Sequence, residues 1–218
     1  MNFSFFLISV LCVSTIGAAP FGNPDDVKKF VKEFVNNFET TTQGWKIDSS
    51  LEHNVIQQIE QRFDDGYTPD WNPQLSDKEN LVNLIINYGR DQDLPYPGIT
   101  QNSTLYEVIE VIPKYFPIIE LTDEQAALVA QVIIDVIVQL QIRGLNVYKP
   151  LRVNVETIVA NSIDEKSEKT NSGVLEASFE EVITNAAINA LKLFQFEGYS
   201  SESTLHDNAN TFFDEFSY

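Results

Sequence analysis

The sequence contains almost no sulfur, since Cys12 and Met1 are its only cysteine and methionine. Cys12 lies in an apolar N-terminal segment that we expect to be removed as a signal peptide. A chain that begins after this segment has no cysteine, so disulfide bonds, thiolate catalysis and cysteine-based metal sites are excluded. About 200 residues remain, which is enough to bury a core without disulfides.

Positive charge is also scarce: 14 Lys and Arg stand against 32 Asp and Glu, a net charge of −18. Phosphate groups are bound by clustered Lys and Arg, so this composition excludes a nucleic-acid-binding protein and disfavours anionic membrane surfaces. An acidic chain of this kind is soluble and favours cationic partners. The simplest interpretation of the charge is a solvated acidic coat.

Catalytic motifs are missing as well. The chain has two histidines, His53 and His206, and it lacks a glycine-rich phosphate loop, a Gly-x-Ser-x-Gly turn and a His-Glu-x-x-His motif. The acidic pairs Asp25-Asp26 and Glu180-Glu181 fall near predicted helix starts, where the helix dipole favours them. We therefore predict that the protein is not an enzyme and that it has no cofactor and no catalytic or metal-binding residue.

Two acidic loops are the remaining candidates for calcium, because carboxylate oxygens are ligands that this ion prefers. The first loop contains Asp64, Asp65, Thr68 and Asp70, and the second contains Asp91 and Asp93. Neither loop has the glycine and terminal glutamate of an EF-hand. The alternative is that aspartate simply favours turns.

The N-terminus has the features of a secretory signal. Residues 3–13 form an apolar run that is too short to span a bilayer, and residues 14–19 are mostly small, as a signal-peptidase site requires. We predict that residues 1–19 are removed, with cleavage after Ala18 or Ala19, and that the protein is secreted and extracellular. Asn102 begins an Asn-Ser-Thr sequon and is the predicted glycosylation site.

Apolar residues recur with helical spacing in seven segments, most of them bounded by capping residues or glycine. These segments begin near Asn23, Asp48, Ser76, Thr104, Thr122, Pro150 and Leu175. The sequence therefore predicts an all-α protein, with a single bundle of about seven helices in residues 20–198. No internal repeat is apparent from the sequence.

The segment from Thr122 to Arg143 is the most apolar helix that the pattern predicts. A capping box opens it, Gly144 is the expected stop, and only a narrow stripe including Gln131 and Asp135 is polar. These polar residues argue against a membrane span. We expect this helix to be the central strut of the bundle. Asp135 lies either on the exposed stripe or, buried, beside a partner.

Residues 199–218 form an acidic, aromatic tail that is either flexible or a short docking helix. Its apolar side chains recur at intervals of three or four residues: Leu205, Ala209, Phe212, Phe213 and Phe216. A helix this short is marginal in water, so its apolar stripe needs another surface. We assign Leu205, Phe212, Phe213 and Phe216 as ligand- or partner-binding residues, docking either on the protein's own body or on a second chain.

Two functions fit these observations. The first is a secreted, non-catalytic interaction or structural protein, in which an acidic helical domain acts through self-association or protein partners. The alternative is an extracellular carrier that binds a lipid-like or other hydrophobic small molecule in a cavity between helices.

Overall fold

A computed structural model describes residues 35–36, 38–91, 98–111, 122–163 and 178–215 of the chain. The protein is mostly helical, at 61% helix, and the all-α prediction is confirmed. After a helical turn at residues 38–41, the described helices are α3 (Leu51–Asp64), α4 (Asp77–Asp91), α5 (Leu105–Val111), α6 (Asp123–Gln139), α7 (Leu151–Ser162), α8 (Phe179–Leu191) and α9 (Leu205–Glu215). The helix predicted to begin near Asn23 lies mainly outside these residues.

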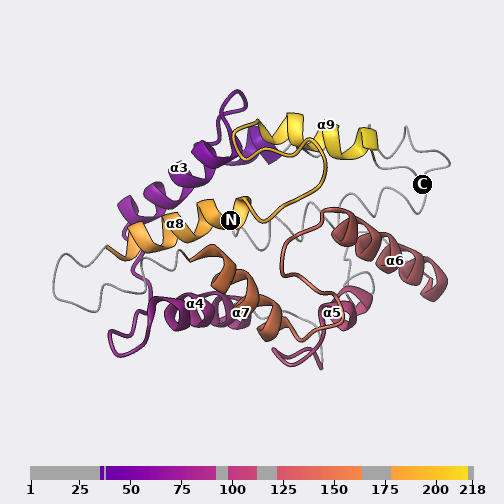
Figure 1. The fold of residues 1–218 in the computed structure, drawn as a ribbon, viewed down its shortest axis with the longest axis horizontal. Coiled ribbons are helices and arrows are strands. Elements are labelled where there is room, and N and C mark those ends of the chain that lie inside the picture. The colour runs from indigo at the N-terminus through magenta and orange to yellow at the C-terminus, as the bar shows by residue number, and fades with distance from the viewer. Residues whose placement is uncertain (1–34, 37, 92–97, 112–121, 164–177, 216–218) are drawn as a thin grey trace.

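The helices pack in neighbouring pairs rather than around one strut. In Figure 1, α8 lies between α3 and α7, α7 also packs on α4, and α5 packs on α6 at the other end of the molecule. The larger core draws on α3, α5, α6, α9 and the loops between them. A smaller core joins Leu81 and Val82 of α4 to Val159 of α7, with side chains of α8 packed against it.

The predicted central position of α6 is wrong, because this helix lies at one end of the molecule (Figure 1). One side of α6, which we call its seam, is buried at Ile133, Val136 and Ile137, but Leu128 is 63% exposed and Val138 is 58% exposed. A helix with this much exposed apolar surface covers one side of the core instead of crossing its middle. None of the helices in the described ranges is long and apolar enough to cross a membrane.

Local capping decides where several helices begin. Ser76 Oγ accepts from the Glu79 N–H, and Glu79 Oε2 accepts from the Ser76 N–H at 3.0 Å. Thr104 and Glu107 form the same reciprocal pair, with the Thr104 N–H 2.6 Å from Glu107 Oε2. Both capping boxes that the sequence predicts at these positions are therefore present.

Two helix ends are not set by glycine. The helix α4 passes through Gly89 and continues to Asp91, so a glycine is tolerated inside it. The long apolar helix ends at Gln139 and not at Gly144, because Gln141 adopts a left-handed backbone conformation with φ of 48°. The chain then turns, and Ile142 is buried beyond the helix end.

The side chain of a buried asparagine holds the loop before α3 by hydrogen bonds to the loop backbone. Asn54, in the second turn of the helix, is 1% exposed. Its Nδ2 donates to Lys46 O at 2.8 Å and to Ser49 O at 3.3 Å, and its Oδ1 accepts from the Lys46 N–H at 2.8 Å. One side chain thus pins the backbone eight residues earlier onto the helix. We call this eleven-residue arrangement, residues 44–54, an asparagine-clasped loop.

The asparagine-clasped loop recurs, which is a structural repeat that was not apparent from the sequence. Buried Asn80, Asn154 and Asn208 each bond both backbone groups of the residue eight positions earlier, namely Asn72, Asn146 and Ser200. The four clasped segments read GWKIDSSLEHN, DWNPQLSDKEN, GLNVYKPLRVN and GYSSESTLHDN from residues 44, 70, 144 and 198. Residues 98–108, GITQNSTLYEV, have the same turn and cap but carry buried Val108 in place of the asparagine.

Glycine begins most of these segments for a steric reason. Gly198 has φ of +75° and follows Phe196 in a turn closed by the Tyr199 N–H and Phe196 O, which requires a positive φ at this position. A Cβ at Gly198 would also lie 2.5 Å from Thr211 Cγ2. Close packing of the loop against its helix therefore demands glycine here.

The loops also pair with one another. Residues 98–108 and 144–154 exchange four backbone hydrogen bonds related by an approximate twofold: Leu105 N to Lys149 O, Tyr106 N to Val147 O, Leu151 N to Ser103 O and Arg152 N to Gln101 O, at 2.8 to 3.2 Å. Loops 44–54 and 198–208 pair at equivalent positions, from Leu51 N to Ser203 O and from Glu52 N to Ser201 O. The pairing supplies acceptors for first-turn N–H groups that a helix leaves unsatisfied.

Candidate interaction surface

The C-terminal tail is docked on the protein's own body. Leu205, Phe212 and Phe213 are 7 to 8% exposed and belong to the larger core. Phe212 lies edge-on to both Phe196 and Phe213, with ring centroids 5.2 and 5.1 Å apart. Three of the four residues assigned to partner binding are thus brought together inside this core, while Phe216 lies outside the described residues.

Asn102, the predicted glycosylation site, is exposed at the tip of the paired loop 98–108. Its backbone N–H donates to Thr100 Oγ1 at 3.2 Å, which shapes the turn and leaves the side chain facing solvent. An exposed acceptor is what glycan attachment requires, and the modification itself stays a prediction.

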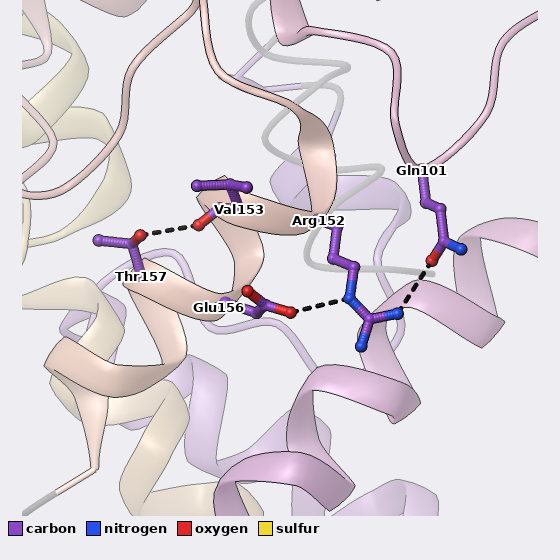
Figure 2. A network of polar contacts seen from close by, with 5 residues as sticks. All are labelled: Gln101, Arg152, Val153, Glu156 and Thr157. Atoms are coloured by element: carbon purple, nitrogen blue, oxygen red, sulfur yellow. Dashed lines mark hydrogen bonds and ion pairs between the residues drawn. The ribbon is translucent and has the colours of Figure 1, made fainter.

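A polar network covers the edge of the same loop pair (Figure 2). Arg152 Nε donates to Glu156 Oε1 at 2.8 Å, and Arg152 Nη1 donates to Gln101 Oε1 at 3.3 Å. The Arg152 and Glu156 side chains are more than 40% exposed, so water screens this ion pair. The network reinforces the contact between the two loops.

We expect Arg152→Ala to lower the free energy of unfolding by no more than about 1 kcal/mol, because exposed ion pairs contribute little. The backbone bond from Arg152 N to Gln101 O survives the substitution. Urea denaturation at low and high salt checks this expectation, and the effect should shrink as salt screens the pair. A loss well above this range would mean that the side chain holds the loop pair together.

The acidic candidates that the structure describes do not come together in one cluster. No group of three or more His, Asp or Glu that could hold an ion occurs within the described residues, which include Asp64, Asp65 and Asp70. Asp93 lies outside them, and the side chain of Asp91 is not described. His53 is exposed on α3 and His206 is half-buried on α9.

Glu39 is an acid that belongs to none of the motifs found in the sequence, yet it is only 2% exposed. Burial raises the pKa of its carboxyl, while His206 and a hydrogen bond with Trp45 act in the opposite direction. Its environment therefore favours the neutral acid more than water does.

The exposed side of α6 is the clearest candidate for an interaction surface. Leu128, Gln131, Asp135 and Val138 are all exposed and follow one another at intervals of three, four and three residues, so they form one stripe. Gln131 Nε2 donates to Asp135 Oδ1 at 2.9 Å, which places Asp135 on the exposed stripe, the first of its two predicted positions.

Tyr148 is the exposed residue that sequence reasoning missed. It is 70% exposed and stacks on Tyr106, with ring centroids 5.7 Å apart and ring planes 24° apart. The only sequence signal was its position in a turn after Asn146, whose Oδ1 accepts from the Tyr148 N–H at 2.9 Å.

Comparisons with protein-family models, with curated proteins and with solved structures found no match.

Proposed function

We propose that this is a secreted, non-catalytic interaction or structural protein whose acidic helical domain acts through self-association or protein partners. Secretion is proposed from the apolar segment at residues 3–13 and the small residues that follow it. The described polar side chains with hydrogen bonds serve mainly to cap helices and clasp loops, which supports a binding role over a catalytic one.

The observation that carries the proposal is the stripe of α6 defined by Leu128, Gln131, Asp135 and Val138. An exposed aliphatic side chain on its own is ordinary. Here two of them flank a hydrogen-bonded polar pair at the spacing of a helix–helix seam. A helix from a second copy or from a partner would cover Leu128 and Val138 and leave the Gln131–Asp135 pair to set the register.

The negative charge of the chain would control this association. Two copies that each carry −18 repel one another at pH 7. Salt, calcium or protonation of carboxylates reduces this repulsion and leaves the apolar contacts to act. Association should therefore increase from pH 7 to pH 5 and with added salt or calcium.

Light scattering after size exclusion tests the proposal across these conditions. We expect the mass of the natural chain to rise at lower pH and with added salt or calcium. The double variant Leu128→Gln, Val138→Thr should keep the mass of a monomer under the same conditions. Ile47→Thr is the matched control, because Ile47 is 47% exposed on a loop remote from α6 in sequence. A monomer under every condition would refute self-association, and a lipid found by mass spectrometry of its organic extract would support the carrier alternative.

A further inference from the structure

The stacked pair Tyr106 and Tyr148 is held in place by the two paired loops that carry it. Tyr106 N donates to Val147 O at 2.8 Å, so the backbone beside Tyr148 is bonded directly to that of its ring partner. Tyr148 is 70% exposed and accessible to a reagent in solution. Among the ring contacts within the described residues, this is the one that joins two tyrosines.

Tyr106 also has a proton acceptor. The carboxylate of Glu110, one helical turn later, raises the pKa of Tyr106 because its interaction with the hydroxyl favours the neutral phenol. A phenol that loses an electron must also lose its proton. The carboxylate of Glu110, four residues later on α5, is the group placed to receive that proton, so oxidation of Tyr106 is assisted by its own helix.

Oxidisable sulfur groups are absent from the expected secreted chain. Thiols and thioethers are common oxidation sites in proteins, and the only two in this sequence are Cys12 and Met1. Both precede the expected cleavage site, so the inference uses the secretion part of the proposed function and none of its association part. Aromatic side chains then become the main oxidisable groups.

We propose that Tyr106 and Tyr148 form a modification site, at which a one-electron oxidant such as a peroxidase with hydrogen peroxide couples the two rings into dityrosine. Each phenol loses one electron and one proton, and the two radicals join through a carbon–carbon bond between their ortho carbons. The ortho hydrogens then move to the oxygens and restore both phenols. Hydrogen peroxide accepts the two electrons and two protons and becomes two molecules of water.

The cross-link would tie the first turn of α5 to the loop before α7 and close the chain between residues 106 and 148. Closing a long loop stabilises a protein by restricting its unfolded chain, as a disulfide does. A chain without cysteine would thereby gain a covalent tie across one of its loop pairs.

The test treats the dilute, secreted chain with a haem peroxidase and hydrogen peroxide, and follows dityrosine fluorescence and the masses of proteolytic peptides. We expect a peptide pair joining Tyr106 to Tyr148 with the loss of two hydrogens, in a protein that remains monomeric and melts at a higher temperature. Tyr148→Phe should abolish this product. Tyr67→Phe is the matched control, because Tyr67 contacts Phe63 and has no tyrosine in that ring contact.

Glu110→Gln should slow the coupling while leaving the circular dichroism spectrum unchanged, and an unchanged rate would refute the role of Glu110 as proton acceptor. Equal dityrosine yield in Tyr148→Phe, or a product joining two chains, would overturn the proposed site. Because the reaction is run on a dilute monomer, its outcome does not depend on whether the chain self-associates.

Discussion

Replacing Asn154 with alanine is expected to lower the free energy of unfolding by about 3 kcal/mol, because a buried polar group left without its partner costs roughly 1–3 kcal/mol. The side chain is 3% exposed and makes three hydrogen bonds. It donates to Asn146 O and Lys149 O and accepts from the Asn146 N–H, at 2.8 to 3.1 Å. Alanine supplies neither the donors nor the acceptor, so these backbone groups lose their partner together.

Asn185→Ala provides the control in a neighbouring helix. Asn185 is exposed in the middle of α8, so both substitutions bring a similar change in helix propensity. We expect the control to change stability by no more than about 0.5 kcal/mol. Denaturant titration followed by circular dichroism measures both variants. Equal losses would show that the clasp contributes nothing beyond helix propensity.

Asn154→Val tests whether a valine can replace the clasping asparagine, as Val108 does in the loop of residues 98–108. Residues 98–108 keep the turn with Val108 at this position, and Val108 is 6% exposed. There the Ser103 side chain accepts from the Thr100 N–H at 3.1 Å, so another group takes over part of the clasp. Loop 144–154 has Lys149 at the position of Ser103. Valine should therefore destabilise this loop nearly as much as alanine does.

Features set by neighbouring residues could be predicted from the sequence. The capping boxes at Ser76 and Thr104 depend on residues three positions apart, and both are present. The helix in the tail was one of two predicted alternatives, and its apolar spacing matches the residues that are buried. Its docking partner could not be derived, because the surface that covers Phe212 and Phe213 comes from distant segments of the chain.

The asparagine-clasped loops could not be predicted from the sequence, for a physical reason. An asparagine inside a helical segment is typical of an exposed polar face, and nothing local shows that its amide turns back to the residue eight positions earlier. The copies are unequally spaced and share few residue types, so periodicity does not reveal them. Pairing between loops, such as 98–108 with 144–154, involves backbone groups whose pattern carries no side-chain signature.

The position of α6 was mispredicted because overall hydrophobicity and burial are separate properties. The helix is apolar on several sides, and this pattern is typical of a helix enclosed by others. In the structure its seam is buried while Leu128 and Val138 face solvent. An apolar side chain that faces solvent carries the same sequence signal as one in the core.

Val136→Asp is expected to have the second large effect, lowering the free energy of unfolding by roughly 3 kcal/mol or more, because a buried carboxylate without a partner is costly. Val136 is 3% exposed and lies in the larger core with Ile133 and Ile137. The substitution removes two buried methyl groups and places a carboxylate among aliphatic side chains. The variant should regain part of its stability at low pH, where the carboxylate binds a proton and becomes neutral.

Val138→Asp in the same helix separates burial from every other consequence of the change. Val138 is 58% exposed, so the new carboxylate stays in water. Both variants exchange valine for aspartate within the last turn of α6, which makes their helix-propensity and dipole costs similar. Thermal and urea unfolding should therefore show a much larger loss for Val136→Asp, and one that depends on pH. If the two variants unfolded alike, the seam of α6 would not be the buried side of this helix, and the exposed stripe proposed for association would have to be reassigned.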